Sequence, residues 1–309
     1  MTTSTAAPCP VCTHTSFAER YRAIGHRFDA CQRCGFTRMA DPLSSPDLAQ
    51  HYAQDRQYGE IAYQEHATNL VRFDEILQRI ERFVPVGRFL DIGCSIGTTL
   101  VAAQKRGWQA IGLELSEPSA DYGRANLGVD IRSCLLSDAG FAQGSFDAIL
   151  MHHTLEHVEQ PDQLIGEIRA LLRPGGVMYQ SLPNHGSLKA RLLGPQFGYG
   201  IVVEHLSHFD RRTLRRMVER MGLQVVASHT RSYRADPRLL WDLAVRSGQQ
   251  RWLERKCGLA EGQSMDPATW LAFLTRTPWA RWICDKAWPA RLCTWLGLGE
   301  DMHLIAKRT

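Results

Sequence analysis

Short apolar runs alternate with segments of helical hydrophobic spacing through the middle of the chain. The runs that are typical of strands lie near residues 88–92, 109–114, 129–132, 146–151, 176–181, 223–230 and 302–307. Helical segments fill most of the gaps between them. Strands that alternate with helices form βαβ units and a mostly parallel sheet. The pattern therefore predicts an α/β fold.

Two stretches lie outside this alternation. Within residues 42–84, apolar residues at positions 70, 73, 76, 77 and 80 mark one face of a helix, so we expect a helical connector that packs on the sheet domain. Residues 234–300 lie between the last two strands and hold seven of the eight tryptophans, with Leu and Arg at roughly helical spacing. A connection this long is expected to carry its own structure. We predict a helical, Trp- and Arg-rich insertion there.

The composition indicates the size of the domain and the cellular compartment. With 309 residues, of which 44% are hydrophobic, the chain can bury one α/β core of roughly 200 residues and still carry attached elements. Its first residues lack the basic and apolar regions of a signal peptide, and no stretch approaches the roughly 18 apolar residues of a membrane span. We therefore expect a cytoplasmic location, where the nine cysteines are thiols or metal ligands.

Four cysteines form two C-x-x-C knuckles with 18 residues between them: Cys9, Cys12, Cys31 and Cys34. Each knuckle offers two thiolates from one tight turn, which is the spacing of structural zinc sites. A redox pair or coincidence is the alternative. We predict a zinc-ribbon module over residues 1–41 with a structural Zn²⁺ ion, because about 35 residues could hardly fold without the metal.

The first strand of the alternating region runs into a turn of small residues, Gly93-Cys94-Ser95-Ile96-Gly97. Such a turn lets the backbone pass close beneath a ligand at the carboxyl ends of the strands. Glu114 ends the next strand about 21 residues after Gly93, a distance at which an acid can accept hydrogen bonds from ribose hydroxyls. Thr98 stands where a dinucleotide turn requires glycine. The turn therefore predicts a site for a nucleoside, and its spacing differs from that of dinucleotide-binding turns.

This pattern resembles the class I S-adenosylmethionine-dependent methyltransferases. Three further segments match that family in order: residues 145–151 as the fourth strand, 155–158 after it, and 171–176 as the turn into the fifth strand. The resemblance implies a Rossmann-like, seven-stranded sheet domain over residues 85–233 and 301–309, with an antiparallel last strand. The helical insertion would then lie between the sixth and seventh strands.

The resemblance also implies S-adenosylmethionine as the cofactor. It places Asp91 near the methionine amino group and Glu114 on the ribose. For adenine, many relatives carry an acid before the fourth strand, and here either Asp138 or the backbone at Leu136 would serve. The residues expected at the cofactor are Asp91, Gly93, Cys94, Ser95, Gly97, Glu114, Leu115, Leu136 and His152.

Methyl transfer needs alignment of the reactants and, for a nucleophile that carries a proton, a base. Histidine suits that role near neutral pH, and the candidates are His153, His205 and His208. Glu156 and His157 follow His153 at i+3 and i+4, on one face if a helix begins there. In a related quinone-pathway group a carboxylate, Glu and His in this arrangement are thought to bind a divalent ion. Here His153 replaces the first carboxylate, which weakens that interpretation.

The alternative for these histidines is a supporting role, as loop hydrogen-bond partners, a helix cap or a seal over the cofactor pocket. A similar choice applies to Tyr52, Tyr58 and Tyr63 of the connector. They either close over the cofactor or pack between the zinc-ribbon module and the main domain.

We expect a small-molecule, sugar or natural-product acceptor, most simply methylated at oxygen with a histidine base. The cysteine-rich front end and residues 204–209 are loosely similar to bacterial methyltransferases of sugar and natural-product pathways. Carbon methylation of a nucleotide sugar, RNA methylation and a catalytically silent binding module are the alternatives. Nucleic acid is disfavoured because the arginines are scattered among acids and the net charge is only +4. The tryptophan-rich insertion is either a helical subdomain or a contact with a membrane or lipid-linked acceptor.

Overall fold

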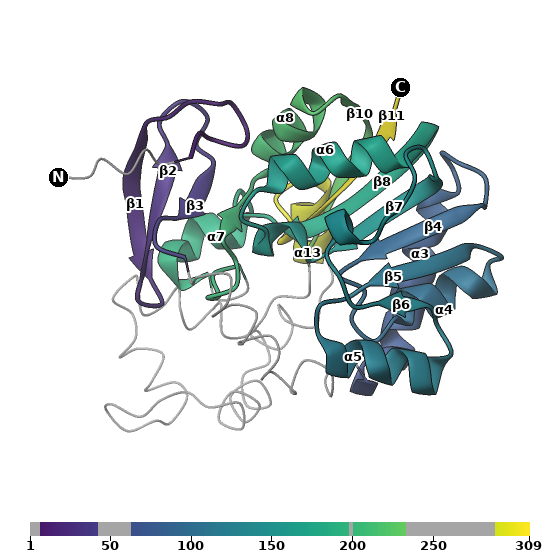
Figure 1. The fold of residues 1–309 in the computed structure, drawn as a ribbon. Helices are drawn as coiled ribbons and strands as arrows, with labels where there is room; N and C mark the ends of the chain where they lie inside the picture. The colour runs from purple at the N-terminus through teal and green to yellow at the C-terminus, as the bar shows by residue number, and fades with distance from the viewer. Residues whose placement is uncertain (1–6, 43–62, 198–199, 233–287) are drawn as a thin grey trace, which may run out of the picture.

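Seven strands form the central sheet of the computed structural model, in the order β10-β11-β8-β7-β4-β5-β6 (Figure 1). The structure describes residues 7–42, 63–197, 200–232 and 288–309. The strands of this sheet are β4 (Arg88–Ile92), β5 (Gln109–Leu113), β6 (Ile131–Arg132), β7 (Phe146–His152), β8 (Leu172–Pro183), β10 (Leu223–Arg231) and β11 (Asp301–Arg308). All seven predicted strands are present.

The strand directions also follow the prediction. The pairs β4–β5, β4–β7, β5–β6 and β7–β8 are parallel, and β11 is antiparallel to both β8 and β10. A Rossmann-like sheet with an antiparallel last strand is therefore confirmed. One boundary differs from the prediction, because β8 begins at Leu172 rather than near 176. A register shift opposite Phe146–Ala148 accommodates the turn at residues 173–176 inside the strand.

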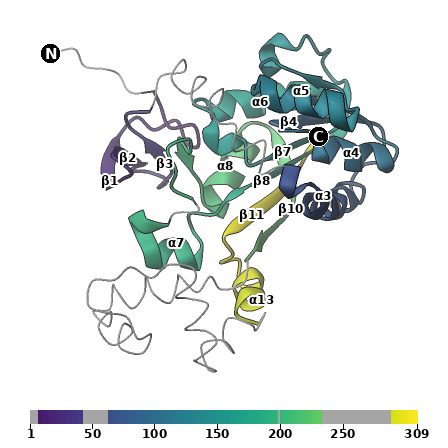
Figure 2. The ribbon, with the colours of Figure 1, turned by 90° about the horizontal axis from the view of Figure 1, so that it is seen from below.

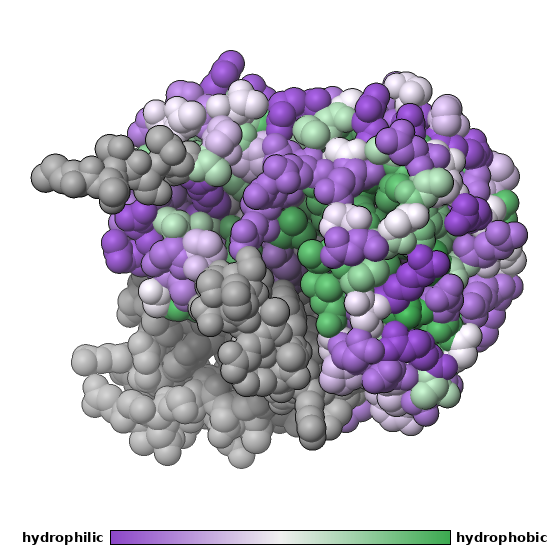
Figure 3. All heavy atoms as spheres, viewed as in Figure 1, coloured by the Kyte–Doolittle hydropathy of each residue, from purple (hydrophilic) through white to green (hydrophobic). Residues whose placement is uncertain are grey.

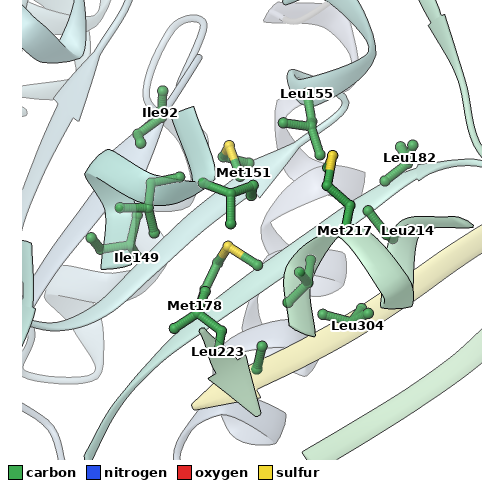
Figure 4. Packing of buried hydrophobic residues seen from close by; sticks show 14 of the residues in the cluster. Ile92, Ile149, Met151, Leu155, Met178, Leu182, Leu214, Met217, Leu223 and Leu304 are labelled. Carbon is green, nitrogen blue, oxygen red and sulfur yellow. The ribbon is translucent and has the colours of Figure 1, made fainter. Parts of the chain in front are cut away.

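Helices cover the two faces of this sheet, because alternate strand residues are apolar on both sides. One apolar cluster joins the sheet to α6 (Pro161–Leu171) and α8 (Arg211–Arg220), and Figure 4 shows Met151, Met178, Leu214 and Met217 meeting inside it. A second cluster joins the other face to α3, α4 and α5. These three helices are α3 (His66–Ile80), α4 (Thr98–Lys105) and α5 (Glu117–Tyr122).

The predicted connector helix is α3. Its buried residues are Phe73, Ile76, Leu77 and Ile80, which belong to the apolar stripe expected from the sequence. In both views α3, α4 and α5 lie at one end of the molecule, and the N-terminal strands lie at the other (Figures 1 and 2). The prediction that this helix packs on the sheet domain is thus confirmed.

The N-terminal module, residues 7–42, forms a sheet of its own from β1 (Phe17–Ala23), β2 (His26–Cys31) and β3 (Thr37–Met39). This sheet takes its fourth strand, β9 (Ser207–His208), from the methyltransferase-like part of the chain. Thr37 pairs with His208 and Arg38 with Ser207. The predicted division at residue 41 remains a prediction, but the sheet itself crosses it.

Apolar contacts reinforce this joint between the module and the sheet domain. The Phe36 and Phe209 ring centroids are 4.9 Å apart. On the other side of the module, Phe28 and Met39 share a buried cluster with Leu206, together with residues of α7 (Leu188–Leu193). Because both clusters contain residues from each side, the module and the segment 205–209 form one packed unit.

Little of the predicted insertion lies within the described residues. Its last part includes a helix, α13 (Trp288–Trp295), in which the side chain of Trp295 is 81% exposed. Five other tryptophans of the insertion lie outside the described residues, as do Tyr52 and Tyr58: Trp241, Trp252, Trp270, Trp279 and Trp282. Within the described ranges, every helix is too short or too polar to cross a membrane.

Candidate cofactor and acceptor sites

The turn after β4 has the backbone shape that its small residues allow. Gly93, Ser95 and Gly97 all adopt left-handed conformations, with φ values of 76°, 50° and 83°. A Cβ at Gly97 would lie 2.7 Å from a methyl carbon of Val129. Gly97 is therefore required both by its left-handed backbone and by the lack of space for a side chain. Gly97 then caps the N-terminus of α4, where backbone amides point toward the turn.

Two acids predicted from the sequence flank this turn. Asp91 is 2% exposed, its Oδ1 atom has no hydrogen-bond partner among the described residues, and burial raises its pKa to about 7. Glu114 accepts hydrogen bonds from the backbone amides of Ser95 and Ser116, both at 2.8 Å. Burial also raises the pKa of Glu114. An ammonium group beside Asp91 would satisfy its oxygen, which fits the methionine end of S-adenosylmethionine.

The remaining cofactor candidates follow neighbouring strands of the sheet: Leu115 comes after β5, Leu136 after β6, and His152 ends β7, where its Nδ1 atom contacts the Ser181 hydroxyl. Leu115 is 59% exposed beside Glu114, and Leu136 is nearly buried in the short helix Leu136–Asp138. In the view of Figure 3, hydrophobic residues are exposed in the middle of the face shown. Cys94 is different, because a Cβ on Gly112 would lie 2.4 Å from its sulfur. Its side chain therefore packs into the sheet, and only its backbone is available to a ligand.

The connector also reaches the turn, through a residue that sequence reasoning missed. His66, in the first turn of α3, lies with its Nδ1 atom 2.8 Å from the Thr98 hydroxyl at the start of α4. Tyr63 lies nearby in the chain, with its ring 5.4 Å from that of Tyr122 on α5. The N-terminal end of α3 is thus placed beside the predicted cofactor turn, as the proposal of a closing connector requires.

A buried charge cluster follows β7. His153 adopts a left-handed backbone, with φ 55°, which turns its ring between two carboxylates. Its Nδ1 atom is 3.2 Å from Glu156 and its Nε2 atom is 3.6 Å from Asp301. Burial opposes the charged form, but the Asp301 and Glu156 carboxylates outweigh it and raise the pKa of His153 to about 10. His153 is therefore an imidazolium at neutral pH.

His205 lies on the other side of Glu156. The His205 Nδ1 atom is 3.0 Å from the carbonyl oxygen of Gly200, so Nδ1 carries the proton and donates it. The Nε2 atom lies on the other edge of the ring, 4.0 Å from Glu156 Oε1. The ring of His157 meets that of His205 edge-on, with centroids 4.8 Å apart. Of the three candidate histidines, His205 has the tautomer that a base requires.

His208 is held between rings on β9. It stacks on His185 at 3.9 Å between centroids and on Phe28 at 4.7 Å. The Tyr21 hydroxyl lies 2.7 Å from its Nδ1 atom. Burial lowers the pKa of His208 well below the ordinary value, and lowers that of His185 to about 3. Both rings are neutral. Because stacking fixes their positions, they are better suited to line a site than to act as a mobile base.

The four predicted zinc ligands converge in the N-terminal module. Their sulfur atoms lie within 4.8 Å of one another, with Cys9 and Cys34 at 3.5 Å and Cys12 and Cys31 at 3.6 Å. Tetrahedral zinc with Zn–S bonds of about 2.3 Å separates its sulfur ligands by about 3.8 Å. The donor set and the spacing therefore fit a closed, structural zinc site.

A second group of possible ligands comprises Glu156, His157 and His205, whose ligand atoms also lie within 4.8 Å of one another. Both Glu156 oxygens are buried without a hydrogen-bond partner in the described part of the chain. One carboxylate and two imidazoles suit a transition metal better than Mg²⁺, which prefers oxygen ligands. The His153 imidazolium already compensates the Glu156 charge, which reduces the need for a cation.

Sequence reasoning missed three residues of this region: Tyr21, His185 and Asp301. Asp301 is fully buried at the start of the apolar strand β11. An acid before an apolar run is visible in the sequence, but the sequence does not indicate which residue it pairs with. His185 follows the fifth strand directly, and its position beyond a carboxyl end was the available signal. For Tyr21 the sequence held no signal, because its partner His208 is 187 residues away.

The charge cluster at His153 makes stability depend on pH. Because its folded pKa is about 10, above the ordinary 6.5, the stabilisation is complete below pH 6.5 and is lost as the pH rises through about 10. We expect His153→Gln to lower the free energy of unfolding at pH 6.5 by roughly 3 kcal/mol, as removal of one partner of a buried ion pair does. Urea unfolding at pH 6.5 and 10.5 checks this. A difference between the two proteins that stays constant with pH would contradict the assignment.

Residues 63–228 match a family profile described as "Methyltransferase domain". A curated relative, the ubiquinone biosynthesis O-methyltransferase of Xanthomonas campestris pv. campestris strain B100, is 34% identical over 125 residues. The match covers 38% of this chain and 52% of the relative, so the chain spans about half the length of the curated relatives it matches.

Two solved structures share the fold. A methyltransferase of Thermotoga maritima, described as a possible histamine N-methyltransferase, has a TM-score of 0.53 at 15% identity and covers 85% of this chain and 99% of its own. A methyltransferase of Archaeoglobus fulgidus has a TM-score of 0.51 at 17% identity and covers 80% of this chain and 99% of its own. Both are described as S-adenosylmethionine-dependent, and at these identities the likeness extends to the fold alone.

Proposed function

The chain belongs to the methyltransferase domain family, and on that basis we propose that it transfers the methyl group of S-adenosylmethionine to a hydroxyl oxygen of a small molecule. Asp91 would bind the ammonium group of the cofactor's methionine part, and Glu114 would bind its ribose hydroxyls. Gly93 and Gly97 would let the protein backbone pass close to the cofactor. The family assignment rests on the matched profile, and the choice of oxygen and of a small acceptor is the proposal.

The observation that carries the proposal is the state of His205. Its Nδ1 proton is donated to the Gly200 carbonyl, so the free Nε2 lone pair can accept a proton from an acceptor hydroxyl. Glu156, buried and anionic, lies 4.0 Å from Nε2 and would stabilise the imidazolium that forms. The cofactor supplies an electrophilic methyl group: its carbon–sulfur bond breaks as the oxygen–carbon bond forms, and S-adenosylhomocysteine leaves.

Two observations favour oxygen in a small molecule. The curated relative with 34% identity is an O-methyltransferase of ubiquinone biosynthesis. A hydroxyl is also the nucleophile that most needs a base such as His205, whereas a neutral amine can attack with its own lone pair. His153 is proposed to act as a fixed cation that holds Glu156, and His208 as a wall of the acceptor site.

The test is transfer of a labelled methyl group into fractionated cell extract. Purified protein is incubated with isotope-labelled S-adenosylmethionine and with low-mass, RNA or protein fractions of the source cells. We expect label only in the low-mass fraction, together with an equal amount of S-adenosylhomocysteine. Label in RNA would establish nucleic-acid methylation instead. Absence of both cofactor binding and label would indicate a silent binding module.

A metal ion at Glu156, His157 and His205 is the other way to activate a hydroxyl in this site. Turnover after dialysis against EDTA, with the zinc content measured on the same sample, separates the two. We expect turnover to survive while zinc remains at the four cysteines. Turnover that is lost with zinc intact, and is restored by added Mg²⁺ or Mn²⁺, would favour the metal.

A further inference from the structure

The N-terminal module holds the chain on which the proposed base lies. His205 is followed directly by Leu206, whose carbonyl oxygen accepts a 2.9 Å hydrogen bond from the Met39 amide of β3. Ser207 and His208 then pair with β3 as strand β9. The next residue, Phe209, packs on Phe36. Every residue from 206 to 209 therefore contacts the module through its backbone or its side chain.

Tyr21 is a polar side chain of this joint that reaches an imidazole ring. It comes from β1, which is separated from β9 by β2 and β3 in the module sheet. Its hydroxyl lies 2.7 Å from His208 Nδ1, and its ring packs on Phe28 with centroids 5.1 Å apart. Burial raises the pKa of Tyr21 to about 12, so the hydroxyl keeps its proton at neutral pH.

The His208 ring has limited freedom apart from this hydrogen bond. It is 3% exposed and lies between the faces of Phe28 and His185. Stacking restrains the ring plane but still allows a flip of roughly 180° around the Cβ–Cγ bond, which exchanges Nδ1 with Cδ2, and a hydrogen bond to Nδ1 selects one of the two orientations. The Nε2 atom has no hydrogen-bond partner in the described ranges, and the Tyr21 hydroxyl contacts the opposite edge of the ring at Nδ1.

We propose that Tyr21 is a positioning residue for the acceptor site: its hydroxyl orients His208 and, through β9, places His205 for proton transfer. This inference rests on the proposed function, since it assigns Tyr21 a part in the same site. It gives the N-terminal module a second task besides folding. The module supplies a wall of the acceptor site and the restraint on its base.

The chain offers a matched control for the loss of one tyrosine hydroxyl. Tyr179 on β8 places its hydroxyl 2.9 Å from Nδ1 of His303, a buried pair of the same chemistry. This pair lies on the sheet face that packs against α3, whose apolar cluster includes Tyr179. Tyr21→Phe and Tyr179→Phe each remove one hydroxyl from one imidazole, and the two differ in location.

The test compares these two variants of the full-length chain, using the acceptor that the labelled-extract experiment identifies. For Tyr21→Phe we expect kcat to fall about tenfold, as small misplacements of a reacting group do, with the Kd for S-adenosylmethionine and the zinc content unchanged. For Tyr179→Phe we expect kcat to stay at the wild-type value. Equal kcat values for the two variants, whatever their melting temperatures, would overturn the proposal.

A second measurement does not require an acceptor. Long-range ¹H–¹⁵N spectra of the imidazole rings report the protonation of His208 Nδ1 and Nε2, with the signals assigned from His208→Gln. We expect Tyr21→Phe to shift the His208 nitrogens, while Tyr179→Phe leaves them in place. An unchanged His208 spectrum overturns the role of Tyr21 even if the wild-type protein methylates the expected class of acceptor. If no acceptor is found, the proposed function fails, and this spectrum still tests whether the Tyr21 hydroxyl orients His208.

Discussion

Replacement of His205 by glutamine is expected to lower kcat by roughly 10² to 10⁴-fold, the contribution of a well-placed general base. The side chain that remains can still fill the space but cannot accept a proton. Binding of S-adenosylmethionine should be unchanged, because Asp91 and Glu114 lie at the ends of other strands. Single-turnover transfer from labelled cofactor measures the chemical step, and calorimetry measures the cofactor Kd.

The pH profile distinguishes a base from a structural residue in this variant. If His205 is the base, the pH profile of kcat in the wild-type protein should have a limb that reports it, and in His205→Gln this limb should disappear. His229→Gln is a suitable control, since His229 is a partly buried histidine on β10 that stacks on His303 away from the acceptor site. A His205→Gln protein that retains the wild-type kcat and the same limb would exclude His205 as the base.

Loss of a zinc ligand is the second change with a large expected effect. Structural zinc contributes roughly 10–16 kcal/mol of binding free energy in small zinc-dependent folds, so Cys34→Ser should unfold the module rather than loosen it. Strand β9 would then lose its partner β3. We expect acceptor turnover to fall by more than about a hundredfold, as loss of a precisely held base and wall would cause. Cofactor affinity should change little, because the glycine turn lies elsewhere.

Metal analysis, calorimetry and turnover on the same preparation check this expectation. Cys293→Ser is the matched control, because Cys293 lies on α13 and is not among the four clustered cysteines. It should retain full zinc content and turnover. A Cys34→Ser protein without zinc that turns over its acceptor at the wild-type rate would show that the module is dispensable for the site.

The features that sequence predicted are those encoded locally. The seven strands follow from apolar runs, and the glycine turn follows from the small residues between Asp91 and Gly97. The turn had to be left-handed at three positions, and glycine or serine occupies each of them. The cysteine cluster is likewise visible from two short knuckles, because each contributes a fixed pair of sulfurs.

The features that sequence did not predict depend on pairing between distant parts of the chain. The ion pair of His153 with Asp301 joins residues that lie far apart in the sequence, and together with Glu156 it makes His153 a cation rather than a base. The β3–β9 pairing is short, and nothing in Ser207–His208 alone indicates a strand. His205 and His208 were equivalent candidates in the sequence, and only their surroundings separate them.

These surroundings sharpen what the acceptor site requires. Glu156 is buried and contacts both His153 and His205, so it couples a fixed positive charge to the proposed base. In the proposed site, the N-terminal module would hold His208 through Tyr21 and Phe28. An acceptor would therefore meet groups from the sheet domain and from the module at once.

The central claim is methyl transfer to oxygen of a small molecule, and the attachment atom of the product tests it most directly. Wild-type protein is supplied with ¹³C-methyl S-adenosylmethionine and the low-mass fraction, and the labelled product is read by NMR. A methyl carbon bonded to oxygen, formed with an equal amount of S-adenosylhomocysteine and absent with His205→Gln, is the predicted result. A methyl carbon bonded to carbon or nitrogen, or one formed equally well by His205→Gln, would contradict the account.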